Sequence, residues 1–117
     1  MTPTEMIDVV RRWFFKVEQA TGPILPDGWF GRPYDNIYLL SNVQLVGDVL
    51  TVYLSEDTSL VFIRLERVYI DKSELVFDGF RGCSFRWKEY GGVQNQERNY
   101  DTGQVRLVPP FGTTVML

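Results

Sequence analysis

The sequence divides at one stretch, which reads Leu25-Pro26-Asp27-Gly28-Trp29-Phe30-Gly31-Arg32-Pro33-Tyr34-Asp35-Asn36. Helix-like sequence precedes this stretch and strand-like sequence follows it. Its two prolines and two glycines interrupt regular backbone structure, so residues 22–36 are predicted to form a loop. Three large aromatic residues lie in the same stretch, and side chains of this kind are usually buried. We therefore expect the loop to fold back onto the body of the protein.

Two interpretations of this loop are open. In the first, its aromatic side chains plug one end of a small sheet or barrel. In the second, the loop is a binding site, since irregular segments on rigid scaffolds often carry function. The candidate binding residues in the loop are Trp29, Phe30, Arg32, Tyr34 and Asp35.

Upstream of the loop, residues 2–21 predict a helix. The segment Thr2-Pro3-Thr4-Glu5 matches a capping box with proline at the first helical position, and Gly22-Pro23 supplies a stop signal. Phe15 falls on the polar side and is expected to tuck under a loop or to mark a contact surface, although a single exposed apolar residue needs no function. The predicted apolar stripe consists of Met6, Val10, Trp13, Val17 and Ala20.

Downstream, in residues 37–108, apolar and polar side chains alternate with a period of two. This pattern predicts antiparallel strands. Residues 43–54 form the clearest hairpin, with Gly47-Asp48 as its two-residue turn. Pairing Val46 with Val49 separates a core face from a polar face, as expected for an antiparallel sheet. The core face then holds Val43, Leu45, Leu50, Val52 and Leu54, and the polar face holds Asn42, Gln44, Thr51 and Tyr53.

A second hairpin is predicted over residues 83–100. Its register sets Arg86 opposite Glu97 and Phe85 opposite Arg98. The second strand of this hairpin is polar on both faces, so we expect it to project into solvent or to line a polar groove. Because basic and aromatic groups can grip a partner, three further candidate binding residues come from this hairpin: Arg86, Trp87 and Arg98.

Together these segments predict a single α+β domain over residues 1–117. The N-terminal helix is expected to pack on a strongly curved antiparallel meander of six to eight strands, with a partly closed barrel as one form of it. A C-terminal tail is expected over residues 109–117, and its apolar side chains favour docking over fraying.

The amino-acid composition excludes some kinds of catalysis. The chain has no histidine and one cysteine, Cys83, so Ser-His-Asp and Cys-His catalysis within this chain are excluded. No metal or cofactor motif is recognisable, and no enzyme class is indicated. A net charge of −3 predicts no nucleic-acid partner. No signal peptide or membrane span is visible, so no membrane partner and a cytoplasmic location are predicted.

The sequence favours a small soluble, bacterial-type, non-catalytic protein that binds a protein partner or a second copy of itself. The expected contact surfaces are the hairpin 83–100 and the loop 25–36, because unclosed sheets leave edges that invite pairing. The alternative is a small-molecule binder with a pocket inside the curved sheet, near Trp29 and Tyr34. A short barrel rich in aromatic residues is usually filled by its own side chains, which counts against this alternative.

Overall fold

A computed structural model describes residues 1–30, 37–55, 57–88 and 95–110. This part of the chain contains one helix and ten strands. The elements are α1 (Pro3–Val17), β1 (Pro23–Leu25), β2 (Gly28–Trp29), β3 (Leu40–Val46), β4 (Val49–Leu54), β5 (Thr58–Ile63), β6 (Arg67–Asp71), β7 (Glu74–Asp78), β8 (Gly82–Lys88), β9 (Asn95–Tyr100) and β10 (Gln104–Leu107).

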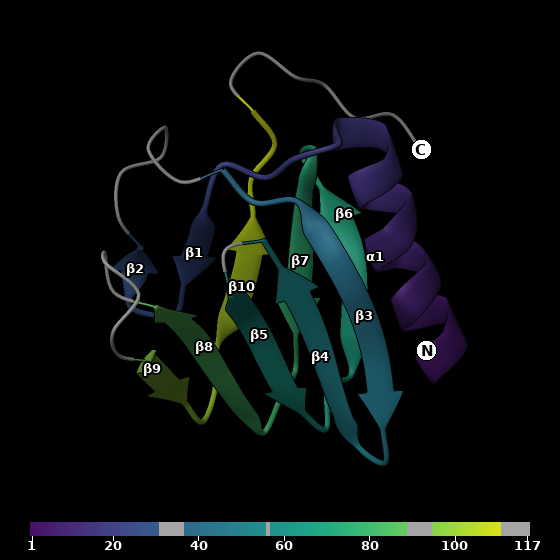
Figure 1. Cartoon of the computed structure of the whole chain (residues 1–117). Helices are drawn as coiled ribbons and strands as arrows, with labels where there is room; N and C mark the ends of the chain where they lie inside the picture. Colours follow the sequence, from purple (N-terminus) through teal and green to yellow (C-terminus); the bar gives the residue numbers. More distant parts are fainter. Residues whose placement is uncertain (31–36, 56, 89–94, 111–117) are drawn as a thin grey trace.

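The strands form two antiparallel sheets of five strands each, one in front of the other (Figure 1). The front sheet has the strand order β3-β4-β5-β8-β9. The back sheet has the order β2-β1-β10-β7-β6. Between the sheets, Phe62 of β5 stacks on Phe77 of β7 with their ring centroids 4.5 Å apart. Both rings are completely buried, so this contact lies at the centre of the core.

The α+β class is confirmed, but the single curved meander is wrong. β5 pairs with β8, and the intervening β6 and β7 belong to the back sheet. The chain leaves the front sheet after Ile63 and returns at Gly82. The segment around Gly79 is the return crossover. Gly79 has a φ of 78°, and a Cβ there would lie 2.9 Å from the Cβ of Glu66. The described strands do not close into a barrel.

The start of α1 is confirmed and its predicted end is wrong. The Glu5 amide donates to Thr2 Oγ1 (3.2 Å) and the Thr2 amide donates to Glu5 Oε1 (3.1 Å), which completes the capping box. The helix ends at Val17 because Glu18 adopts a φ of 66° and its amide donates back to the Phe14 carbonyl (2.7 Å). Beyond it, Ala20 forms an isolated antiparallel bridge with Tyr38, and the Thr21 amide donates to the Val108 carbonyl (2.9 Å).

Part of the predicted loop 22–36 is also strand. Pro23–Leu25 forms β1, which pairs with β10, and Gly28–Trp29 forms β2, which pairs with β1. The loop prediction failed here because Pro23 lies at the start of a strand, where a missing backbone donor is tolerated. Residues 31–36 lie outside the described part of the chain, as do residues 111–117 of the expected tail.

Helix α1 lies along the flank of the two sheets (Figure 1) and contacts β3 and β6, an edge strand of each sheet. Trp13 is completely buried, and its Nε1–H donates to the carbonyl of Ser73 in the β6–β7 turn (3.0 Å). Phe15 is 80% exposed, in line with its position off the stripe. Every residue of the predicted stripe is buried: Met6, Val10, Trp13, Val17 and Ala20.

Both predicted hairpin registers are confirmed. In the first, Val46 pairs with Val49, and the register shifts once, between Leu40 and Asn42 of β3. In the second, Arg86 pairs with Glu97 and the whole predicted alignment holds for the described residues. The tip of the second hairpin, residues 89–94, lies outside them.

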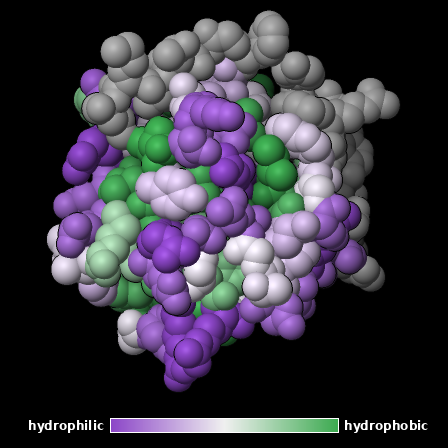
Figure 2. Space-filling model, turned by 180° about the vertical axis from the view of Figure 1, so that it is seen from behind, coloured by the Kyte–Doolittle hydropathy of each residue, from purple (hydrophilic) through white to green (hydrophobic). Residues whose placement is uncertain are grey.

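The outer face of the back sheet carries a network of charged side chains. The Arg106 guanidinium contacts Asp71 (3.2 Å) and Glu74 (3.1 Å), and Arg67 contacts Asp78 (2.7 Å). The hydrogen bond from Arg67 holds the pKa of Asp78 below its ordinary value. Figure 2 shows this face, with hydrophilic side chains over its middle and hydrophobic ones visible on either side.

Replacing Phe62 by alanine is expected to lower the free energy of unfolding by roughly 3–5 kcal/mol, because the change leaves a cavity in the stacked core. Denaturant unfolding followed by tryptophan fluorescence measures the loss. The matched control is Phe15→Ala, which removes the same ring from an exposed site and should change stability by less than about 0.5 kcal/mol. Equal losses in the two variants would contradict the packing described above.

Candidate binding surfaces

The end of the molecule away from α1 contains a cluster of aromatic side chains. Phe30, which follows β2, packs against two residues of β8. Its ring centroid lies 4.7 Å from that of Phe85 and 4.6 Å from that of Trp87. Phe30 is half-buried in this position and packs against the main core. The interpretation of the loop as a plug predicts packing of this kind for Phe30.

Strand β9 adds a cation to the cluster. The Arg98 guanidinium carbon lies 5.2 Å from the Phe30 ring centroid and 5.9 Å from that of Trp87, within reach of cation–π attraction. Its Nη1 also lies 3.8 Å from Asp27 Oδ1, which accepts a hydrogen bond from the Tyr100 hydroxyl (2.8 Å). Burial, together with the hydrogen bond to Asp27, raises the pKa of Tyr100 to about 12.

The eight predicted binding residues are thus divided among different places. Phe30, Trp87 and Arg98 meet in the cluster. Trp29 is 44% exposed and pairs with Ile24 in the back sheet. Arg86 lies on the outer face of the front sheet, where its Nε is 3.1 Å from Glu97 Oε2. Three of the predicted residues lie outside the described part of the chain: Arg32, Tyr34 and Asp35.

The outer face of the front sheet has an apolar end. Val46, Val49 and Ile63 are cross-strand neighbours on three adjacent strands, and we refer to them as the aliphatic row. Val46 is 68% exposed and Ile63 is 44% exposed. Next to the row, Arg64 Nε lies 3.2 Å from Asp48 Oδ2 in an exposed ion pair. This end of the face therefore combines exposed branched side chains with one charge of each sign.

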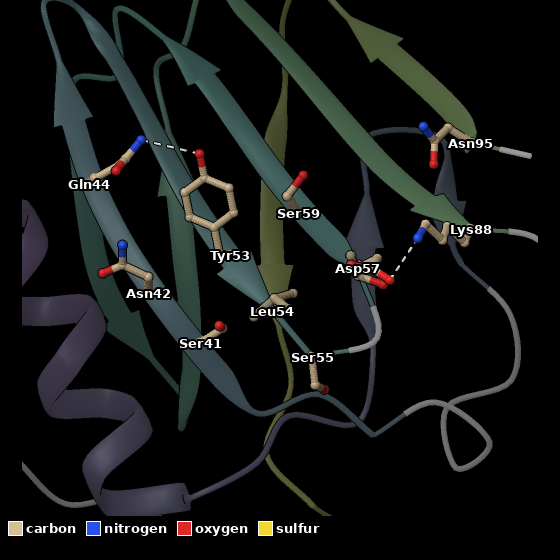
Figure 3. Close-up of a pocket in the computed structure, with 11 residues that line it drawn as sticks. Ser41, Asn42, Gln44, Tyr53, Leu54, Ser55, Asp57, Ser59, Lys88 and Asn95 are labelled. Carbon is tan, nitrogen blue, oxygen red and sulfur yellow. Dashed lines mark hydrogen bonds and ion pairs between the residues drawn. The ribbon is translucent and has the colours of Figure 1, made fainter. Parts of the chain in front are cut away.

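The opposite end of the same face is hollowed and polar (Figure 3). The hollow has a volume of about 690 Å³ and crosses from β3 to β9. We refer to it as the polar hollow. It is lined by Ser41, Asn42, Gln44, Tyr53, Leu54, Ser55, Asp57, Thr58, Ser59, Lys88 and Asn95.

Two contacts organise the polar hollow. Gln44 Nε2 donates to the Tyr53 hydroxyl (3.2 Å), and Lys88 Nζ lies 3.0 Å from Asp57 Oδ2. Figure 3 shows the Tyr53 ring standing between Gln44 and Ser59. The side chain of Ser59 has no hydrogen-bond partner within the described residues, and the same holds for Asn42 and Asn95.

Sequence reasoning missed the polar hollow for an identifiable reason. The predicted hairpin register already placed Gln44 and Tyr53 on one polar face. The hollow also needs Ser59 of β5 and Lys88 of β8, which meet on that face only because β5 pairs with β8. The sequence does contain polar residues at alternate positions of several strands. This pattern, however, does not indicate which strands are neighbours in the sheet.

Cys83 offers little chemistry in this environment. It is buried on the core face of β8, and burial raises the pKa of its thiol to about 12. The nucleophilic thiolate is therefore disfavoured at neutral pH. Within the ranges that the structure describes, no three carboxylate or thiol side chains gather to hold a metal ion. No described helix is long and apolar enough to cross a membrane.

Comparison with known proteins found no matching family model, no matching curated protein and no matching solved structure. The surfaces of this chain must therefore be interpreted from their own residues.

Stability should fall at high pH as Tyr100 loses its proton. The folded-state pKa of about 12 lies above the ordinary tyrosine pKa of 10.0, so the stabilising contribution is complete below about pH 10 and is lost as the pH rises through 12. Urea unfolding measured between these pH values should show the loss in the wild type and a smaller one in Tyr100→Phe. Tyr53→Phe is the control and should keep the wild-type slope. A Tyr100→Phe profile identical to that of the wild type would contradict this prediction.

Proposed function

We propose that the protein is a non-catalytic interaction module that associates with a second copy of itself through the aliphatic row. The observation that supports this proposal is the exposure of Val46 and Ile63 on either side of the half-buried Val49 on a sheet face. Single exposed apolar residues are ordinary on protein surfaces, whereas contiguous ones mark interaction sites. No described element covers this face of the front sheet (Figure 1).

The charges beside the row favour a second copy as the partner. A two-fold contact brings the same patch together from both chains. Each copy contributes one cation and one anion, Arg64 and Asp48, so opposite charges can face each other across the contact. Within the described residues of this face, Arg86 also pairs with Glu97, and Lys88 pairs with Asp57. Association therefore does not have to overcome an excess of like charge.

Pairing through the free edge of β9 fits this chain less well, although the sequence favoured the hairpin 83–100. No described strand pairs with the outer edge of β9. A symmetric antiparallel pairing centred on Glu97 or on Arg98 would set that residue opposite its own copy, and like charges opposite each other are destabilising. Charged residues on an edge strand also discourage edge-to-edge association. We therefore place the contact on the face of the sheet.

The association should be weak, because three aliphatic side chains and two charges make an interface below the standard size for stable complexes.

Two other expectations from the sequence stay predictions. One is a small-molecule site near Trp29 and Tyr34. The other is a cytoplasmic location, with which the free thiol of Cys83 is compatible because reducing compartments keep thiols unpaired.

Light scattering coupled to size-exclusion chromatography tests the proposal. The wild-type mass should rise with concentration toward twice the mass of one chain. Val46→Lys should stay at the mass of one chain, since a two-fold contact would then bring two lysines together beside a desolvated apolar row. Phe15→Lys is the matched control: it places the same charge at an exposed apolar site on α1, and it should associate as the wild type does.

A wild-type mass of one chain at every concentration would contradict self-association. Association lost in Phe15→Lys and kept in Val46→Lys would place the contact on α1 and would also contradict the proposal.

A further inference from the structure

We propose that the polar hollow is a binding site for a neutral oligosaccharide. This site is separate from the proposed contact between copies. Val49 of the aliphatic row and Tyr53 of the hollow lie four residues apart on β4, which corresponds to about 14 Å along the strand. A ligand in the hollow and a second copy on the row can therefore be tested independently.

The hydrogen-bonding groups of the hollow match a ligand rich in hydroxyl groups. Serine and threonine hydroxyls both donate and accept, and so do the amides of asparagine and glutamine. Sugar hydroxyls need such mixed partners, because each of them also donates and accepts. The side chains of Asn42, Ser59 and Asn95 have no hydrogen-bond partner among the described residues, so they are available to a ligand.

Tyr53 adds an apolar surface in the middle of these polar groups. Its side chain is 37% exposed, and the hydrogen bond from Gln44 holds its hydroxyl in place. Tyrosine combines an apolar ring with a polar tip, so it can pack against the C–H face of a sugar ring while its hydroxyl stays hydrogen-bonded. This pairing of one ordered ring with surrounding hydroxyls and amides favours a sugar over a purely polar ion.

The charge of the hollow argues against anionic ligands. Its only lysine, Lys88, lies 3.0 Å from Asp57, so the two charges largely cancel. The whole chain carries a net charge of −3, which would repel a phosphate or a nucleic acid. The lining also lacks the apolar walls that a hydrophobic ligand needs.

The size of the hollow fits a short chain of sugar rings. Its volume of about 690 Å³ falls within the range of about 300–1,000 Å³ that is typical of ligand clefts. The lining residues come from all five strands of the front sheet, from β3 on one edge to β9 on the other. Several sugar units lying across the strands could therefore be contacted at once.

Titration followed by amide NMR tests the proposal. The probes are cellohexaose, maltohexaose, xylohexaose and chitohexaose, with pyrophosphate as the charged comparison. At least one neutral hexasaccharide should give saturable shifts at the amides of Asn42, Tyr53 and Ser59. Tyr53→Ala should weaken that affinity by about tenfold, since it removes the packing of the ring on the sugar.

The back sheet offers a matched control for Tyr53. Tyr69 lies on β6, and its hydroxyl accepts a hydrogen bond from Gln104 Nε2 (3.4 Å), just as the Tyr53 hydroxyl accepts one from Gln44. Tyr69→Ala should leave the affinity unchanged. Val46→Lys should also bind as the wild type does, so loss of self-association and loss of sugar binding would be read separately.

Three outcomes would overturn the proposal. The first is the absence of saturable shifts with every neutral hexasaccharide at millimolar concentration. The second is equal affinity in the wild type and in a folded Tyr53→Ala variant, with folding checked from the dispersion of the amide spectrum. The third is tighter binding of pyrophosphate than of any sugar at the same amides.

Discussion

The arrangement of the protein depends on the burial of one helix stripe against two edge strands. Trp13 of α1 is completely buried and bonds to the Ser73 carbonyl, while the helix contacts both β3 and β6. These two strands would otherwise be open edges at the same flank of the molecule. A completely buried tryptophan removes a large apolar area from water, and such burial is the main favourable contribution to folding. The helix therefore holds the two sheets together at that flank, and Phe62 stacked on Phe77 fills the space between them.

Because side chains fill the described interior, a ligand or partner would have to bind at the surface. The described part of the core is occupied by large side chains, and the cluster of Phe30, Trp87 and Arg98 packs the end opposite the helix. The outer face of the back sheet is covered by ion pairs such as Arg106 with Asp71 and Glu74. The outer face of the front sheet also carries ion pairs, and it adds exposed aliphatic side chains at one end and a polar hollow at the other. This contrast is why both proposals concern the front sheet.

Local patterns in the sequence predicted much of the fold. The capping box at Thr2 and Glu5, the stripe around Trp13 and the registers of both hairpins depend on residues close in sequence, and the structure has them as predicted. Long-range pairing was not predictable in the same way. The apolar run Leu60-Val61-Phe62 indicates a central strand, yet its pattern does not say that the neighbour is β8 rather than β6. The polar hollow depends on that pairing, so it could not be found from the sequence. Phe30, Trp87 and Arg98 were predicted as binding residues, and the structure brings them together as a packed cluster.

The pairing of β5 with β8 assembles the face on which both proposals rest, and proton NMR can detect it. In antiparallel strands, partner residues bring their backbone protons close enough for cross-strand nuclear Overhauser effects. The structure predicts such effects between Val61 and Ser84 and between Ser59 and Arg86. Effects between β5 and β6, which a single meander in sequence order would produce, would contradict the two-sheet arrangement and remove the polar hollow with it.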